Sequence, residues 1–325
     1  MKRTTSAILT AAFILILAAC NGTSGGLGSV PSAVPTPSPD ASGTDLTPAP
    51  SGSSSPSSGP STEPSDAPGA SATPAGTSGE TMIVRAYFVL GGGPGSTGLV
   101  PVLRVVPKSA AVATAAMNAL LAGPTTKEAG DRTMTSAIPD GTGLLGVTIK
   151  NGVATANLSS EFDSGGGTPS LQYRLAQVVY TLTQFTTVKS VVFQIEGQTV
   201  TVFGSEGIVL DGPVGRADYT AQLPAIFVDR PAYGAAIGNP AKVSGNADVF
   251  EATFRAAILD GSGKTLVDQQ VMASCGTGCR GTFSATLPYT VGKAQYGTLR
   301  VYDPSEKDGT PESIRDYPVW LTPAG

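Results

Sequence analysis

Alternating apolar and polar residues on either side of Asn151-Gly152 predict two β-strands joined by a tight turn. Before the turn the apolar positions are Leu145, Val147 and Ile149, and the second run covers residues 153–158. Asn and Gly both tolerate positive φ, so this pair is the strongest short signal for a two-residue hairpin. The alternation favours a buried apolar face and shows no catalytic pair. We therefore interpret the hairpin as a folding nucleus rather than an active site.

The residues before this hairpin predict two strands and a helix. Residues 82–90 and 99–106 are rich in β-branched and aromatic side chains, which favours strands. Ser109 is placed to cap a helix that extends through Ala122, and Gly123-Pro124 is a typical helix end. Residues 125–139 then predict a long connection to the hairpin.

A second helix is predicted to begin at Thr168, with Pro169 at its first position, where a missing N–H costs nothing. Residues 188–195 and 199–203 predict a further hairpin. Strands and helices alternate without the regularity of a parallel βαβ array, so residues 81–212 are predicted to form an α+β domain. The apolar residues of the second helix repeat at helical spacing and form one face: Leu171, Leu175, Val178, Leu182 and Phe185.

Residues 225–325 have a different pattern, and residues 213–224 predict a short connector before them. About seven short β-like runs in roughly 100 residues, with no convincing helix, are typical of an immunoglobulin-like sandwich. We expect this domain to fold separately from the first. Trp320 lies in the last run, where we expect core or inter-domain packing rather than a ligand platform. The predicted strands are residues 227–228, 241–245, 250–259, 265–271, 281–287, 298–302 and 317–321.

The N-terminus has the pattern of an export signal. Lys2 and Arg3 precede an apolar stretch, residues 7–17, that is shorter than the about 20 residues of a membrane-spanning helix. Leu17-Ala18-Ala19-Cys20 resembles the bacterial lipobox, so residues 1–20 are predicted to be a lipoprotein signal peptide with Cys20 as the acylated residue. A plain secretory signal is the alternative.

Residues 21–80 consist mostly of Ser, Pro, Gly, Thr and Ala. Such a segment cannot bury enough apolar surface to offset the entropy lost on ordering, so it is predicted to be a disordered linker. A lipid on Cys20 and this linker would hold the folded domains at the outer face of the cytoplasmic membrane.

Composition removes several classes of chemistry. The chain has no His, which excludes the Ser-His-Asp triad and the usual zinc sites, and its net charge is −4. No basic run suggests nucleic acid. The Gly-rich residues 91–98 lack the Gly-Lys-Ser/Thr ending of a phosphate loop, which predicts an ordinary flexible loop. No cofactor, metal or catalytic residue is predicted.

Two groups of acidic residues are candidates for a catalytic or ion-binding site. Glu161 and Asp163 form a candidate carboxylate pair, but glycoside hydrolysis needs a defined separation and one acid with a raised pKa. Loop charges in contact with solvent are the simpler interpretation. A second group is spaced like an acidic loop, for which weak calcium binding is the alternative: Asp303, Glu306, Asp308 and Glu312. This group lacks the spacing and the Gly of an EF-hand, so solvated loop charges are again the simpler interpretation.

Cys275 and Cys279 flank Gly276-Thr277-Gly278. In an exported protein this pair predicts a small disulfide between two strands. A metal site would need two further ligands, and a redox role is the alternative, although the spacing is not Cys-x-x-Cys.

Motifs in both predicted domains are similar to those of known families. Residues 120–124 are Leu-Leu-Ala-Gly-Pro and residues 138–142 are Ile-Pro-Asp-Gly-Thr. With residues 152–159 and 181–188, they make the first domain resemble the GerMN domain of sporulation and spore-germination lipoproteins. Residues 243–252, 281–283 and 308–310 make the second resemble the immunoglobulin-like domain often found after it.

The resemblance implies a lipid-anchored, non-enzymatic binding or assembly module that contacts envelope proteins or the cell wall. The family has no agreed catalytic residues, so none is transferred to this chain. GerMN-like domains are similar to ring-building modules of secretion complexes, which implies protein–protein contacts. The alternative is a cell-wall hydrolase that uses carboxylates.

Overall fold

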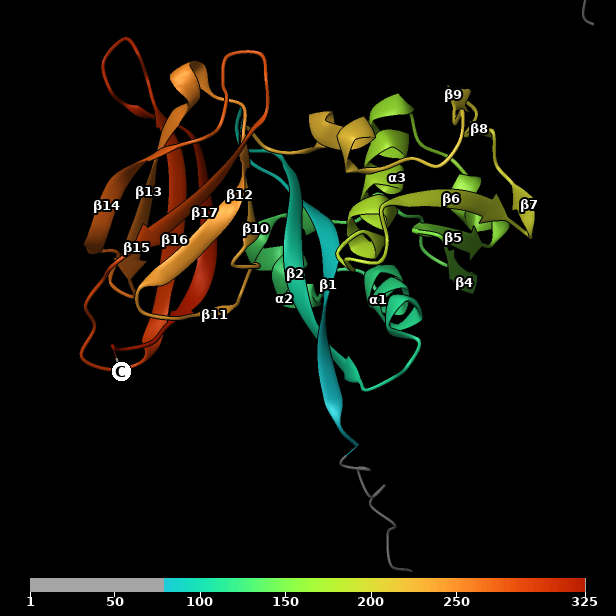
Figure 1. Ribbon diagram of the computed structural model, residues 1–325, viewed down its shortest axis with the longest axis horizontal. Coiled ribbons are helices and arrows are strands. Elements are labelled where there is room, and N and C mark those ends of the chain that lie inside the picture. Colours follow the sequence, from blue (N-terminus) through green and yellow to red (C-terminus); the bar gives the residue numbers. More distant parts are fainter. Residues whose placement is uncertain (1–78, 325) are drawn as a thin grey trace, which may run out of the picture. The chain divides into compact units, whose positions relative to one another are not determined.

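The computed structural model describes residues 79–324 (Figure 1). The predicted signal peptide, Cys20 and nearly all of the predicted linker lie outside these residues. Among residues 79–324, no helix has the length and apolar character needed to cross a bilayer. The fold is a mixed α+β region followed by a β-sandwich, which confirms the predicted fold class.

The first region begins with a three-stranded antiparallel sheet in the order β2-β1-β3. Strands β1 (Thr81–Leu90) and β2 (Gly98–Pro107) confirm the predicted pair, and β3 (Met134–Thr135) adds a short edge. Helix α1 (Val112–Leu121) follows and ends before Gly123, which has φ 75°. Ser109 does not cap it, which corrects the prediction. The Ser109 hydroxyl accepts a hydrogen bond from the Ala111 N–H, and the helix starts later.

Helix α3 (Thr168–Leu182) is buried along almost its whole length, and three of its buried residues are polar or charged. Two of them bind the backbone of β1 at Tyr87, on the edge away from β2, where β3 does not reach. Gln177 Nε2 donates to the Tyr87 carbonyl at 2.9 Å, and the Tyr87 N–H donates to Thr181 Oγ1 at 3.2 Å. Because a buried backbone group needs a partner, these side chains replace a missing strand and fix β1 against the helix.

A four-stranded sheet in the order β4-β5-β6-β7 lies on the other side of α3 (Figure 1). Strands β4 and β5 are antiparallel, and α3 connects β5 to its parallel neighbour β6. The Asn151-Gly152 turn is confirmed, with φ of 53° and 82°. The strands are β4 (Leu144–Lys150), β5 (Val153–Leu158), β6 (Ser190–Ile195) and β7 (Gln198–Thr199).

The interpretation of this hairpin as a buried nucleus is wrong for its first strand. Leu145 and Ile149 are 51% and 44% exposed, because β4 is the sheet edge and a bulge interrupts its register after Leu144. The buried face belongs to β5, where Ala154 and Leu158 are inaccessible to solvent. The strand in the middle of the sheet, and not the more apolar one, therefore carries the core.

Two segments predicted to be connections contain regular structure. Residues 125–139 include α2 (Thr126–Arg132) and β3, and the connector 213–224 includes the 3₁₀-helix Arg216–Gln222, which buries Tyr219. Thr125 and Glu128 form a capping box at the start of α2. Three further short elements complete the region: the 3₁₀-helix Ser160–Asp163, β8 (Val202–Phe203) and β9 (Ile208–Val209).

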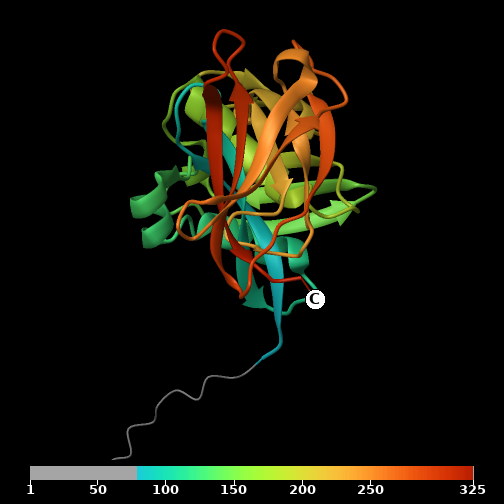
Figure 2. The same cartoon turned by 90° about the vertical axis from the view of Figure 1, so that its left-hand side faces the viewer.

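The second region is a sandwich of a three-stranded sheet, β10-β12-β15, and a five-stranded sheet, β11-β17-β16-β13-β14 (Figure 2). The predicted strand 250–259 starts late, because Phe250–Ala252 form a 3₁₀-turn with positive φ at Glu251 and Ala252. Phe254 and Phe283 meet edge to face between the sheets. The strands are β10 (Ile226–Arg230), β11 (Ala236–Ile237), β12 (Ala241–Ala247), β13 (Thr253–Asp260), β14 (Thr265–Met272), β15 (Gly281–Leu287), β16 (Gln295–Pro304) and β17 (Pro311–Leu321).

Buried side chains form one continuous apolar cluster through both regions. Tyr180 on α3 packs edge to face on Phe227 of β10, with ring centroids 5.9 Å apart. Backbone hydrogen bonds also cross, from the Tyr233 N–H to the Pro101 carbonyl and from the Ala225 N–H to the Gly95 carbonyl, each at 2.8 Å. Each region therefore covers part of the core of the other.

We expect residues 81–212, expressed alone, to melt at least several degrees below the full chain. Removing the sandwich exposes Tyr180, which packs on Phe227 in the full chain, and each kcal/mol lost lowers the midpoint of a domain of this size by several degrees. Thermal unfolding followed by circular dichroism measures the difference. Equal midpoints would show that the two regions are independent.

Candidate binding groove

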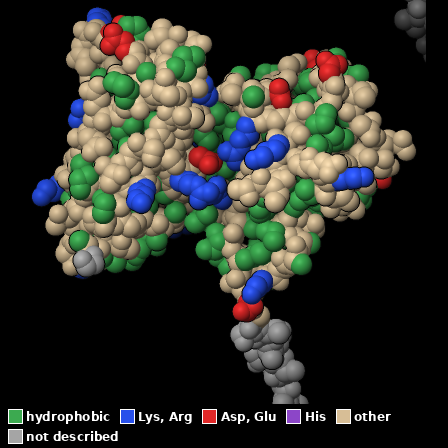
Figure 3. Space-filling view, in the orientation of Figure 1, with side chains coloured by type: hydrophobic (Ala, Val, Ile, Leu, Met, Phe, Trp, Pro, Cys, Tyr) green, Lys and Arg blue, Asp and Glu red, His purple; other side chains and the backbone are tan. Residues whose placement is uncertain are grey.

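A network of charged side chains connects the two regions. The Tyr87 hydroxyl donates to Asp229 Oδ1 at 2.6 Å, and Arg216 Nη2 donates to the Tyr87 hydroxyl at 3.1 Å. Arg85 and Arg216 form ion pairs with Asp229 at 3.8 and 3.6 Å. Figure 3 shows Lys and Arg side chains around an acidic one near the middle of this face. Because these groups satisfy one another, we interpret the network as a structural joint.

Two tyrosines at this joint have a raised pKa. Burial raises the pKa of Tyr87 and of Tyr180 to about 12, although the Arg216 guanidinium opposes the shift. Arg216 lies over both rings, 5.4 Å from the Tyr87 centroid and 4.6 Å from that of Tyr180. Both hydroxyls therefore stay protonated in the folded protein at pH values where an exposed tyrosine ionises.

We predict that stability falls steeply between pH 10 and 12. The unfolded chain loses the two phenolic protons near pH 10 while the folded chain keeps them to about 12, so rising pH favours unfolding by roughly 1.4 kcal/mol per unit for each group. Denaturant titrations at pH 8, 9, 10 and 11 test this. The Tyr180→Phe variant should show a shallower fall, and an identical slope would contradict the assignment.

A second joint is built on Arg315 of β17, which is only 2% exposed. Its guanidinium donates to the carbonyls of Ser96, Gly98 and Leu99, at 3.1 Å for Gly98 and 3.0 Å for Leu99. The Gly-rich residues 91–98, predicted to be an ordinary flexible loop, are thus fixed at one end by the sandwich. The two joints together hold the outer face of β16 and β17 beside the first region.

A groove of about 720 Å³ lies on this outer face, with α2 as one wall. Arg104 donates to both carboxylate oxygens of Glu128, at 2.9 and 2.7 Å, and Glu128 also accepts from the Thr125 N–H at 2.8 Å. These bonds fix the start of α2 at the groove. The floor is formed by β13, β16 and β17, and the turn between β13 and β14 is the opposite wall. Lining residues include Lys127, Glu128, Asp260, Tyr296, Arg300 and Pro318.

One exposed aromatic side chain lines this groove, and a second lies beside it. Tyr296, which lines it, is 74% exposed, and Trp320 on the adjacent strand is 36% exposed. Their rings meet edge to face with centroids 4.7 Å apart, because Tyr296 and Trp320 are directly opposite in the register of β16 and β17. The expectation that Trp320 packs in the core or between domains is therefore wrong.

The carboxylates of the groove are held ionised. Hydrogen bonds from the Ser262 hydroxyl and the Lys264 N–H lower the pKa of Asp260. Burial opposes the shift for Glu128, but the hydrogen bonds from Arg104 and Thr125 outweigh it and lower its pKa. A general acid for glycoside cleavage needs the opposite shift. Neither group is suited to donate a proton near neutral pH.

The acidic candidates from the sequence do not join this groove. A hydrogen bond from the Ser159 hydroxyl lowers the pKa of the exposed Glu161, and Asp163 accepts from the Gly204 N–H at 2.6 Å. No three metal-ligating side chains cluster anywhere in residues 79–324. Asp303, Glu306 and Glu312 line a separate pocket of about 450 Å³, where burial and the two glutamates raise the pKa of Asp303. Hydrogen bonds from the hydroxyl and the N–H of Thr310 lower the pKa of the fourth acidic residue, Asp308.

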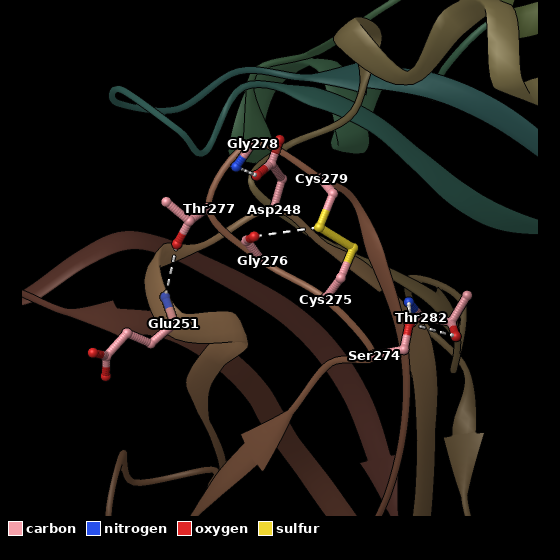
Figure 4. The surroundings of a disulfide bond; sticks show 9 residues. All are labelled: Asp248, Glu251, Ser274, Cys275, Gly276, Thr277, Gly278, Cys279 and Thr282. Carbon is pink, nitrogen blue, oxygen red and sulfur yellow. Dashed lines mark hydrogen bonds between the residues drawn. A yellow bond between two sulfur atoms is a disulfide. The ribbon is translucent and has the colours of Figure 1, made fainter.

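Cys275 and Cys279 are joined in the structure by a disulfide in the loop between β14 and β15, with Cα atoms 6.0 Å apart (Figure 4). Thr277 of the same loop accepts a hydrogen bond from the Glu251 N–H, and its own N–H donates to the Val249 carbonyl. The loop is therefore also held by contacts that do not depend on sulfur.

We predict that the Cys275→Ser/Cys279→Ser double variant folds and melts several degrees lower. The bridge closes a short loop, for which the chain-entropy model gives about 2 kcal/mol. Differential scanning calorimetry measures the shift, and mass spectrometry of the native chain counts its thiols. Two free thiols there would contradict the bridge. Loss of an activity without loss of stability would favour the redox alternative.

The structure belongs to the class of two-domain proteins in which an α+β domain is followed by an immunoglobulin-like sandwich. Residues 85–201 match the family model Germane, described as sporulation and spore germination, and residues 225–310 match Gmad2, the immunoglobulin-like domain of bacterial spore germination. The chain therefore carries a GerMN domain followed by the spore-germination immunoglobulin-like domain, as its motifs suggest.

Solved structures similar to this chain include the first GerMN domain of the sporulation protein GerM from Bacillus subtilis. It is 24% identical over 42% of this chain and 99% of that one, with a TM-score of 0.36. The tandem GerMN domains of the same protein are 16% identical over 64% of this chain and 62% of that one, with a TM-score of 0.37. No curated protein matches the chain significantly.

Proposed function

We propose that this protein is a non-enzymatic binding module of a sporulation- or germination-type system, and that it holds an envelope ligand in the groove between α2 and β16. One observation carries the proposal: Glu128, Asp260 and Arg300 of the groove are held by hydrogen bonds, whereas the Tyr296 and Trp320 rings are exposed beside them. A mixed aromatic and polar concavity of this size is typical of ligand sites.

The proposal places the module at the outer face of the cytoplasmic membrane. Acylation of Cys20 would anchor it, and residues 21–80 would act as a tether that lets the groove reach the cell wall or neighbouring envelope proteins. An envelope protein and the wall itself are the two kinds of partner within reach.

A carboxylate-dependent wall hydrolase is the competing function. In the described residues the groove carboxylates have lowered pKa values, which suits binding and not proton donation. Asp303 has a raised pKa but lies in the other pocket. Zymography on peptidoglycan separates the two functions: the proposal predicts no clearing, and clearing that disappears in Asp303→Asn would establish the hydrolase.

Photo-crosslinking in native envelopes tests the groove as the binding site. A photoreactive amino acid replaces the exposed Lys127 of the groove wall in the full chain, and the exposed Lys293 outside the groove serves as the matched control position. The proposal predicts adducts from position 127 that disappear in a Tyr296→Ala background. Adducts from position 293 alone, or from neither position, would contradict it.

A further inference from the structure

We infer that the ligand of the groove is a cell-wall glycan, a saccharide chain without strong net charge that stacks on Tyr296. This inference rests on the proposed function and identifies its substrate class. A sugar ring has one face of C–H groups and a rim of hydroxyls. The groove offers an aromatic surface beside polar groups that are already oriented, which matches both features.

The aromatic surface is preorganised. Trp320 meets the Tyr296 ring at an interplanar angle of 83°, so Tyr296 is supported along one edge while most of its surface stays exposed. An aromatic body with a polar tip gains from apolar contact at low entropic cost. Thr298 and Pro318 pair in the next row of β16 and β17 and extend the surface into the groove.

Two polar side chains that line the groove are held by hydrogen bonds that do not use all of their donor or acceptor atoms. Asp260 Oδ1 accepts from the Ser262 N–H at 2.9 Å, the Ser262 hydroxyl at 2.6 Å and the Lys264 N–H at 3.0 Å, and Oδ2 accepts from none of these. Arg300 binds Asp316 through two bonds of 2.8 Å, which fixes the plane of its guanidinium. Groups fixed in this way bind hydroxyls without a further ordering cost.

The charge of the lining argues against polyanions. Lys127 and Arg300 are balanced by Glu128 and Asp260, so the groove has no excess of positive charge. Nucleic acids and other phosphate polymers require such an excess, because their affinity comes from neutralised phosphates. A neutral polar chain has no such requirement, and a volume of about 720 Å³ is within the range of small-molecule sites.

The test uses the only tryptophan of the chain. Trp320 is the single Trp and contacts Tyr296, so its fluorescence reports directly on the groove. The full chain is titrated with the soluble tetramer of N-acetylglucosamine. We expect a saturable change in emission, binding weakened about tenfold or more in Tyr296→Ala, and binding retained in Tyr296→Phe. Phe250→Ala, which removes an exposed aromatic outside the groove, should bind as the unmodified chain does.

Three results would overturn the inference. They are no saturable change with the tetramer, equal binding by Tyr296→Ala, and a change produced by a peptide of the Pro-rich residues 31–50 but not by the glycan. Unchanged melting temperatures confirm that the variants are folded. If crosslinking from position 127 persists when no glycan binds, the proposed function stands and only the glycan assignment fails. If both fail, the groove is not a binding site.

Discussion

Replacing Arg315 by Met is expected to lower the free energy of unfolding by roughly 3 kcal/mol or more. The side chain is buried and donates to the carbonyls of Ser96, Gly98 and Leu99, so its loss leaves buried acceptors without that donor. Methionine has a similar length and fills most of the volume, which isolates the hydrogen bonds from packing. Thermal and urea unfolding of the full chain measure the loss.

Arg300→Met is the matched control for this change. Arg300 lies on β16 beside Arg315 of β17 and pairs with Asp316, but both side chains of this pair are more than a third exposed. Exposed ion pairs contribute about 0–1 kcal/mol. Equal losses in the two variants would show that Arg315 is not a joint between the regions.

Gly245→Ala is expected to be at least as damaging, with a loss of about 3 kcal/mol or more. Gly245 lies on β12 between β10 and β15, and an added Cβ would overlap the backbone carbonyl oxygen of Phe227. A backbone atom in a central sheet cannot move away without breaking its pairing, so the substitution forces the strands apart.

Gly292→Ala is the control for the general effect of replacing a glycine by alanine in this region. Gly292 is an exposed loop residue of the same region with nothing within 4 Å of an added Cβ. It should change the melting temperature little. A large loss there, or none at Gly245, would contradict the packing of the three-stranded sheet.

Local sequence signals predicted the elements whose conformation depends on local chemistry. Asn151-Gly152 adopts the positive φ values that tight hairpins need. The capping box of Thr125 and Glu128 was also present in the sequence as a Thr-x-x-Glu pattern, and it marks the helix that the prediction treated as connection.

Burial was harder to predict because it depends on position in the sheet. Leu145 and Ile149 alternate correctly but lie on an edge strand, so they remain exposed. The expectation of core or inter-domain packing for Trp320 did not use the alternation of its strand. The alternation of β17 predicts the exposure of Trp320 correctly, because every second residue of the strand is buried and Trp320 lies between two of them. The buried residues are Arg315, Tyr317, Val319 and Leu321.

The groove itself could not be predicted, because its walls and floor come from three segments that are distant in the sequence. Residues 125–128, 260–263 and 296–300 come together only when the sandwich packs against the first region. That packing depends on Asp229 and Arg216, one at the end of a strand and the other in a predicted connector, and neither has a sequence pattern of its own.

The central claim is that the groove binds an envelope ligand without cleaving it. Co-sedimentation with detergent-extracted native envelopes, combined with an assay for released reducing ends, tests both parts at once. The account predicts that the full chain sediments with the envelopes, that Tyr296→Ala does not while Phe250→Ala does, and that no reducing ends appear. Undiminished sedimentation of Tyr296→Ala, or release of reducing ends by the unmodified chain, would contradict it.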